Sequence, residues 1–331
     1  MKRLLLGLLF AALAAPAISW AEEVVVYSSR KEHLIKPLFD RFTAETGIQV
    51  TYLTDKAGPL IQRLKAEGRR TPADMLITVD AGNLWQAAEN DVLAPVESEV
   101  LNANVPASLR DPQGRWFGLS KRARTIVYST ERVKPEDISS YEDLADAKWK
   151  GRLCLRTSKK VYNQSLVATL IARHGEDKAE QIVRGWVNNL AVAPFSNDTK
   201  TMEAVLAGQC DVAIVNTYYF GRMQKKNPQI ALALAWPNQQ TSGVHINVSG
   251  AGITKHAKHP EAALKLLEWL SSETAQGDFA GLNMEYPVNP AVSPVEQVQS
   301  WGEFVGDDLN VNEAGRLQAD AIRLMDRAGY R

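Results

Sequence analysis

Strand-like and helix-like segments alternate along the chain with short connections, and this alternation limits the fold more than any other feature. Glu23–Tyr27 and Ile48–Tyr52 are rich in Val, Ile and Tyr, and a helical pattern covers Leu34–Thr46 between them. Apolar residues recur in that helix at helical spacing, and Gly47 is placed to end it. The pattern predicts an α/β fold in which helices lie over a parallel sheet.

The chain is long enough for two domains, because about 310 residues follow the first 21 and exceed one comfortable core. A second α/β unit starts after Thr125–Ser129, and Ile246–Ile253 has the pattern of a long strand returning to the first unit. We expect an N-terminal lobe of residues 22–121 plus about 249–297. The C-terminal lobe would hold about 122–248 plus 298–331, with hinge strands and a central ligand cleft between the two.

The first 21 residues have the features of a cleavable signal peptide. Met1-Lys2-Arg3 supplies positive charge, the apolar run Leu4–Ala15 follows, and Ser19-Trp20-Ala21 is a small-x-small cleavage site. The run is shorter than the roughly 20 residues that span a bilayer, and no later stretch resembles it. We therefore expect export to the periplasm without insertion into the membrane.

Charge and motif content exclude several classes of function. The chain has 38 Lys and Arg against 38 Asp and Glu, which gives no bulk reason to expect nucleic acid or an anionic membrane as partner. An exported hydrolase is disfavoured because the chain lacks a Gly-x-Ser-x-Gly elbow and a His-Glu-x-x-His motif. A structural protein or adhesin is disfavoured because two hinged lobes imply a cleft. We expect a binding protein that is not an enzyme.

Three tyrosines lie where a strand passes into a helix. Tyr218 and Tyr219 follow the strand-like run Asp211–Val215, and Tyr162 follows Arg152–Arg156. An aromatic residue after a strand often only packs a helix onto the sheet, and for any single tyrosine that interpretation is the better one. Three phenols at the same kind of junction instead favour a shared ligand site.

The two cysteines have the same spacing from these tyrosines. Cys154 lies eight residues before Tyr162, and Cys210 lies eight residues before Tyr218. A disulfide between them would bring their α-carbons within about 7 Å and place their two strands side by side, with the tyrosines at similar height. An oxidising compartment permits that bond. The alternative is two free buried thiols.

Five segments in this order resemble periplasmic ferric-iron-binding proteins, which are the substrate-binding components of ABC importers. They are Val25–Arg30, Phe39–Gly47, Gly118–Arg124, Val161–Leu166 and Asn216–Tyr219. The resemblance implies a class II periplasmic-binding-protein fold in which Tyr162, Tyr218 and Tyr219 bind ferric iron. It also implies a monomer that delivers iron to an ABC permease with its ATPase subunit.

The sequence departs from one branch of that family, in which a His-Tyr pair follows the first strand. Arg30-Lys31-Glu32-His33 stands here instead, and we expect His33 to be exposed at a helix start. The departure implies that a synergistic anion, carbonate or bicarbonate, completes the iron coordination. Its positive partner would be Arg122 or Arg124, with Arg30 as a further candidate from the opposite wall, because arginine suits bidentate anion contacts.

The same fold also suits a polyamine, thiamine or a phosphonate. Such pockets use acidic residues and stacked aromatics for a cation, or hydrogen-bond donors for a phosphonate, and have no need of adjacent phenols. Ferric iron is a hard cation that prefers oxygen ligands, which phenolates supply. His245, His256 and His259 have no metal-ligand context, and we expect them to be solvated. We therefore favour iron held by tyrosines.

Overall fold

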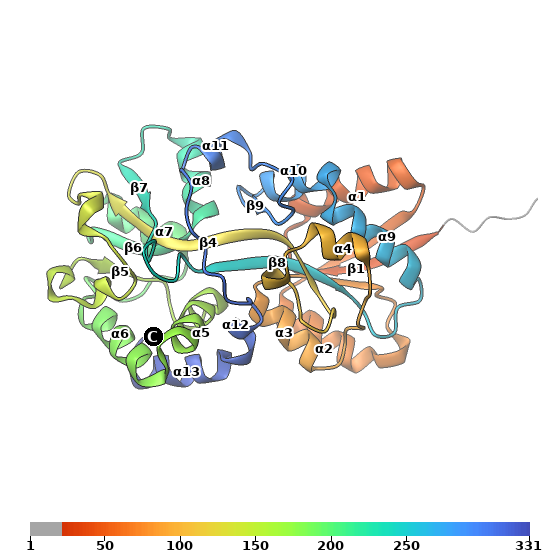
Figure 1. The fold of residues 1–331 in the computed structure, drawn as a ribbon, viewed down its shortest axis with the longest axis horizontal. Coiled ribbons are helices and arrows are strands. Elements are labelled where there is room, and N and C mark those ends of the chain that lie inside the picture. The colour runs from red at the N-terminus through yellow and green to blue at the C-terminus, as the bar shows by residue number, and fades with distance from the viewer. Residues whose placement is uncertain (1–21) are drawn as a thin grey trace, which may run out of the picture.

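Two α/β lobes lie side by side in the computed structural model, which describes residues 22–331 (Figure 1). The predicted signal peptide, residues 1–21, lies outside the described residues. Within the described part of the chain, no helix combines the length and the apolar character that crossing a membrane requires. The two-lobed α/β fold expected from the sequence is confirmed.

The N-terminal lobe is built on three parallel strands in the order β2-β1-β3. These are β1 (Glu23–Ser28), β2 (Gln49–Thr54) and β3 (Met75–Val79). The predicted first helix is α1 (Glu32–Thr46), which ends at Gly47 with a φ of 78°. Glycine adopts that left-handed conformation without steric cost. The lobe's other helices are α2 (Ala57–Glu67), α3 (Ala81–Glu89), α4 (Glu99–Asn104), α9 (Pro260–Ser271) and α10 (Glu273–Gly281).

Two long antiparallel strands join the lobes, β4 (Phe117–Ser129) and β8 (Ile246–Ile253) (Figure 1). β4 pairs with β8 as far as Ala123 and with β6 from Arg124 onward. A short strand, β9 (Tyr286–Pro287), pairs with the opposite edge of β4. The change of partner falls two residues beyond the lobe boundary expected at residue 121, and we propose it as the point where the lobes divide.

The C-terminal lobe continues the sheet from β4 through β6 (Val212–Asn216) to β5 (Leu153–Cys154), while β7 (Leu232–Ala235) also pairs with β4. Its helices are α5 (Val161–His174), α6 (Glu176–Asn188), α7 (Asp198–Leu206), α8 (Thr217–Lys226), α11 (Glu296–Gln299), α12 (Glu313–Arg316) and α13 (Gln318–Arg327). Short 3₁₀ turns at Gly68–Arg70, Ala107–Leu109, Pro135–Asp137, Asp143–Ala145 and Ala147–Trp149 complete the described elements.

The last helical segment of the chain is interrupted near its start. It is split into α12 and α13 at Leu317. Gly315 of α12 lies so close to α3 that an added Cβ would be 2.2 Å from the Trp85 side chain. We attribute the break to this close packing between helices of the two lobes.

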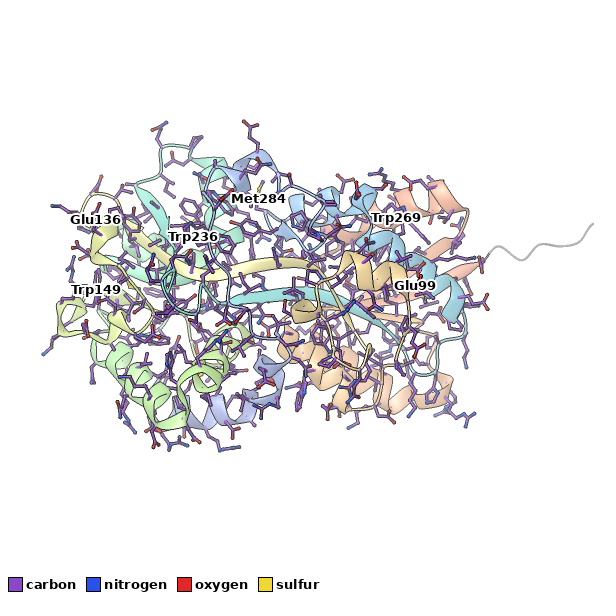
Figure 2. All side chains as sticks on the ribbon, viewed as in Figure 1. Glu99, Glu136, Trp149, Trp236, Trp269 and Met284 are labelled. Carbon is purple, nitrogen blue, oxygen red and sulfur yellow. A yellow bond between two sulfur atoms is a disulfide. The ribbon has the colours of Figure 1, made fainter. Side chains whose placement is uncertain are left out.

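Aromatic side chains anchor the packing at both ends of the molecule (Figure 2). In the N-terminal lobe Trp269 packs edge-on against Phe42, with ring centres 5.6 Å apart. In the C-terminal lobe Trp149 is fully buried. Each lobe thus has large apolar groups of its own, away from the strands that connect them.

The predicted disulfide joins Cys154 and Cys210, whose α-carbons are 5.9 Å apart. β5 and β6 run parallel, as expected, but Cys154 pairs with Ala213 in the ladder, three residues beyond Cys210. Tyr162 and Tyr218 are nevertheless each the second residue of the helix that follows, α5 and α8. The two helices therefore start at the same edge of the sheet.

Removing the disulfide should destabilise the protein without removing the fold. The bond closes a loop of 56 residues, which on a chain-entropy account contributes about 4 kcal/mol to the free energy of unfolding. The double variant Cys154→Ala/Cys210→Ala should lose about that much in urea unfolding followed by circular dichroism. Wild-type protein unfolded with a thiol reductant is the matched comparison. Equal stability of variant and oxidised wild type would contradict the expectation.

Candidate functional site

A cavity of about 320 Å³ between the lobes is lined by all three predicted tyrosines, Tyr162, Tyr218 and Tyr219. Tyr162 enters from the first turn of α5, and the other two enter from the first turn of α8. The rings of Tyr218 and Tyr219 are 4.5 Å apart. The parallel neighbours β5 and β6 are followed by α5 and α8, and this arrangement brings the three tyrosines together. It also explains why each cysteine lies eight residues before a tyrosine.

The phenols are held in a desolvated environment. Tyr162 and Tyr218 are buried, whereas Tyr219 is half-buried. Burial is the main cause that raises the pKa of Tyr162 to about 12, and the charge of the nearby Tyr219 is the second cause. Burial and the neighbouring Tyr162 also raise the pKa of Tyr218, whose hydroxyl accepts a hydrogen bond of 3.1 Å from Asn216 Nδ2. Tyr162 and Tyr218 are therefore neutral at neutral pH until a cation displaces their protons.

The rest of the cavity lining is strongly basic. Six cationic side chains line it: Arg30, Lys31, Lys56, Arg122, Lys160 and Arg222. Among the described residues of the lining, Glu285 is the one acidic side chain, and it is paired with Arg30 at 3.0 Å. Since the whole chain has no net formal charge, this excess is local. The cavity can attract and hold an anion.

Arg122 reaches the cavity from β4, as predicted for an anion-binding residue. Its Nη2 lies 3.2 Å from Asp80 Oδ2, and both side chains are buried. The other terminal nitrogen, Nη1, has no hydrogen-bond partner among residues 22–331. The guanidinium lies 5.4 Å from the centre of the Tyr162 ring. A buried donor without a partner is costly, so Nη1 is free to receive an acceptor beside the tyrosines.

Arg30 also lines the cavity, from the N-terminal lobe. Its Nη1 donates to Ser120 Oγ and to Glu285, and its Nη2 donates to the Phe279 carbonyl. The guanidinium stacks 4.3 Å from the centre of the Phe279 ring. Nε of Arg30 has no partner among the described residues, but three hydrogen bonds of its guanidinium are already made against one for Arg122, so Arg30 offers less to an incoming anion.

Arg124, the alternative to Arg122, is not among the residues that line the cavity. Its guanidinium makes five hydrogen bonds inside the C-terminal lobe, to Asn163, Asp198, Asn216 and the Ile214 carbonyl. Asp198, the first residue of α7, is the buried counter-ion of Arg124 and Arg156. The N-cap of α7 is Asn197. Arg124 thus holds the lobe together behind the tyrosines.

Other residues of the cavity were missed in the sequence. Arg222 follows Tyr218 by four residues and Tyr219 by three, and its guanidinium lies 5.1 and 5.5 Å from their ring centres. Helical spacing would have identified it. Arg222 also donates to Asn283. Asn283 and Glu285 are far away in the sequence, and no local pattern marks them.

The histidines take no part in the cavity. His33 is exposed, as predicted. His245 is buried, contrary to the expectation, with Nδ1 3.0 Å from Thr169 Oγ1, and burial together with Arg122 and Arg124 lowers its pKa to about 3. Across residues 22–331, no group of three or more His, Cys, Asp and Glu side chains is arranged to hold a metal ion.

The fold and the cleft define a solute-binding protein. Residues 37–305 match the family described as bacterial extracellular solute-binding protein, and the chain belongs to this family. Such proteins bind solutes and are not enzymes.

Several relatives are named for iron uptake or iron binding. Iron uptake protein A1 of Synechocystis sp. is 45% identical over 316 residues, which cover 94% of this chain and 88% of the relative. The structure of Trichodesmium IdiA (FutA) in complex with iron and citrate ligands has 43% identity and a TM-score of 0.91, covering 93% of this chain and 100% of that one. Mannheimia haemolytica ferric iron-binding protein A in an open conformation has 38% identity and a TM-score of 0.88, with coverages of 94% and 99%.

A relative with a different named ligand shows why the site must decide the cargo. A putative 2-aminoethylphosphonate-binding periplasmic protein of Salmonella typhi is 28% identical over 344 residues, covering 98% of this chain and 97% of the relative. The overall fold is therefore shared by proteins for different solutes. Side chains in the cleft carry the distinction.

The Asp80–Arg122 pair should be a large contributor to stability because both groups are buried. Asp80→Asn keeps the shape and the ability to cap α3 but leaves Arg122 without its counter-charge, which should lower the free energy of unfolding by about 3 kcal/mol. Asp40→Asn is the control, since Asp40 forms an exposed pair with Lys36 and should cost less than about 1 kcal/mol. Urea unfolding measures both, and equal losses would contradict the assignment.

Proposed function

We propose that this protein captures ferric iron in the periplasm through Tyr162, Tyr218 and Tyr219 and delivers it to an ABC permease. The observation that carries the proposal is the meeting of three phenols from two helix starts in one cavity. Phenolate oxygens suit a hard trivalent cation. The iron-binding relatives named above support the same cargo.

A synergistic anion accompanies the iron in this proposal. Three phenolates balance the three positive charges of ferric iron. Arg30 and Arg122 have their own carboxylate partners, so the charges of Lys31, Lys56, Lys160 and Arg222 remain to be compensated. Carbonate or bicarbonate bound to Arg122 Nη1 would supply negative charge and further oxygen ligands at once. Support comes from the Trichodesmium relative, whose structure holds iron together with citrate, another carboxylate-type anion.

The position of the cavity between the lobes supports the proposed delivery. Side chains of the two lobes meet at its mouth, where Arg222 donates to Asn283. Closing around the cargo excludes water and strengthens the interactions of iron with its ligands. A permease that separates the lobes would reverse this, with ATP hydrolysed by its ATPase subunit. The binding protein would act as a monomer.

A phosphonate is the second candidate cargo. The basic lining favours it, since Arg122, Lys160 and Arg222 could surround a phosphonate group. A polyamine or thiamine fits less well, because Glu285 is already neutralised by Arg30 and leaves no free carboxylate for a cation. A phosphonate alone gives no role to three adjacent phenols, and iron is therefore preferred.

Iron binding should be visible as a colour. Phenolate bound to ferric iron absorbs in the visible range, so titration of the iron-free mature protein with a ferric salt should give a band that saturates near one equivalent. The band should strengthen or shift when bicarbonate is added. A colourless titration would contradict the iron proposal, and a thermal-shift screen with 2-aminoethylphosphonate would then test the second candidate.

Replacing single tyrosines with phenylalanine should show which of them bind iron. Tyr219→Phe should weaken iron binding by at least about 100-fold, since loss of outer-shell partners alone costs 10–100-fold. Folding should be nearly unaffected because Tyr219 is half-buried. Tyr52→Phe is the control, as its hydroxyl donates to Glu32 outside the cavity. Unchanged affinity in Tyr219→Phe, measured by competition with a chelator, would remove Tyr219 from the ligand set.

Iron uptake should release protons and weaken in acid. The pKa of Tyr162 is about 12, so its phenol is protonated at neutral pH and must lose a proton to bind iron. If three tyrosines each lose one proton on binding, the affinity for iron should fall by up to about 1000-fold for each unit that the pH decreases. A pH-stat measures the release when a ferric chelate is added, with the chelate alone subtracted. Tyr219→Phe should release one proton fewer, and equal release would count against Tyr219 as a ligand.

A further inference from the structure

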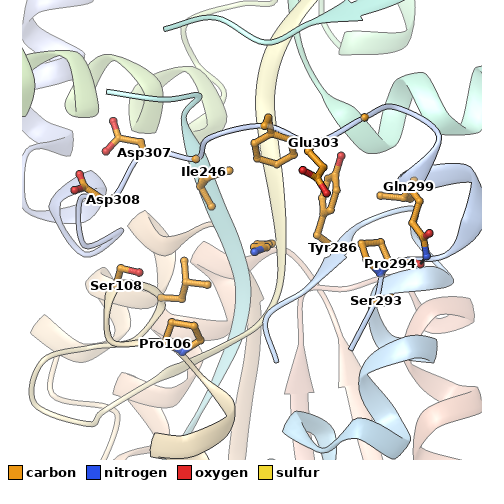
Figure 3. A pocket seen from close by; sticks show the side chains of 16 residues that line it. Pro106, Ser108, Ile246, Tyr286, Ser293, Pro294, Gln299, Glu303, Asp307 and Asp308 are labelled. Carbon is orange, nitrogen blue, oxygen red and sulfur yellow. Dashed lines mark hydrogen bonds between the residues drawn. The ribbon is translucent and has the colours of Figure 1, made fainter. Parts of the chain in front are cut away.

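A second and larger cavity lies on the other side of the strands that join the lobes (Figure 3). Its volume is about 760 Å³, within the range of pockets that hold small organic molecules. None of the residues that line it lines the tyrosine cleft. We refer to it as the back cavity.

Alternation along the hinge strands separates the two cavities. Arg122 of β4 and Ser249 of β8 line the tyrosine cleft, whereas Lys121 of β4 and Ile246 of β8 line the back cavity. The pattern repeats beside β9, where Glu285 lines the cleft and Tyr286 the back cavity. Successive residues of a strand point to opposite faces. β4, β8 and the chain around β9 therefore present polar side chains both to the tyrosine cleft and to the back cavity.

Lys121 and Tyr286 form a pair of donors without acceptors. They stand directly opposite each other in the β4–β9 ladder, so their side chains share a face. The backbone of Lys121 pairs with β8 and β9, but its ammonium makes no ion pair or side-chain hydrogen bond with any of residues 22–331. Tyr286 is 7% exposed, and its hydroxyl has no partner among those residues. Both groups would be satisfied by one ligand with two acceptor oxygens.

The position of Tyr286 is fixed by its neighbours. Its ring packs edge-on against Phe304, with centres 5.3 Å apart, and against Trp301 at 6.3 Å. Figure 3 shows Tyr286 beside Glu303 within the cavity. The hydroxyl is thus presented by a rigid aromatic cluster, as a preformed binding group requires.

The charges of the cavity select the kind of anion. Asp307 and Asp308 line it but are both paired with Arg173. Glu303 also lines it and is exposed. With these carboxylates nearby and Lys121 as the unpaired cation, a dianion would be repelled while a monoanion would be tolerated. Apolar surface from Leu109, Ile246 and Phe304 suits a hydrocarbon body.

We propose that the back cavity binds a small organic monocarboxylate. Its two oxygens accept from the Lys121 ammonium and the Tyr286 hydroxyl, and its aliphatic part packs against Ile246 and Phe304. This site is independent of iron and has its own ligand chemistry.

Isothermal titration calorimetry on the iron-free mature protein tests the proposal, with 4-methylpentanoate as the probe. The uncharged 4-methylpentanamide has the same skeleton and should bind at least about tenfold more weakly, since a charge-assisted hydrogen bond is lost. Lys121→Met should weaken binding of the carboxylate by about tenfold or more. Tyr286→Phe should weaken it by several-fold while leaving the protein at least as stable, because it removes a buried hydroxyl that has no partner.

Lys160→Met is the control for binding in the tyrosine cleft, where Lys160 lies. It should leave the affinity for 4-methylpentanoate unchanged. Loss of binding in Lys160→Met but not in Lys121→Met would place the acid in the cleft and overturn the proposal. Equal binding of acid and amide, or no binding of the acid at about 10 mM, would overturn it as well.

Discussion

The antiparallel pairing of β4 with β8 is the interaction on which the rest of the molecule depends. It runs from Phe117 to Ala123 with a shift of register between Gly118 and Ser120, and beyond Ala123 β4 leaves β8 and joins β6. Because β4 changes partner from β8 to β6, its first half belongs to the sheet of one lobe and its second half to the sheet of the other. The backbone of β4 therefore stays hydrogen-bonded where the chain passes between the lobes. Because strand residues alternate, this ribbon also sets which side chains face the tyrosines and which face away.

Electrostatic organisation is the second constraint on the site. A chain without net charge gathers six cationic side chains around the three phenols. Two of the arginines are held by buried carboxylates, Arg30 by Glu285 and Arg122 by Asp80. Arg124 has the same chemistry but all of its donors are used within its lobe. Arg122 and Arg124 therefore differ in whether a hydrogen-bond donor remains without a partner, and composition does not reveal this.

Local patterns predicted the parts of the fold that depend on local physics. Helical spacing and Gly47 located α1, and the matched intervals from Cys154 and Cys210 to their tyrosines predicted two helices that start at one edge. Features that depend on contacts between distant segments could not be derived in this way. The burial of His245 and the counter-ion role of Asp198 arise only after the sheet has formed. The break between α12 and α13 likewise depends on Trp85, more than 200 residues earlier.

All three phenols come from α5 and α8, which stand on one lobe. Under the proposed function, in which these phenols hold the cargo, the two lobes act in a fixed order. Cargo can be held by that lobe while the mouth is still open, and the other lobe arrives afterwards as a cover. Opening the lobes would then not release the cargo by itself, because the phenols of the C-terminal lobe would still bind it. In that proposal, a receiving channel would have to offer competing oxygen donors or protons as well as separate the lobes.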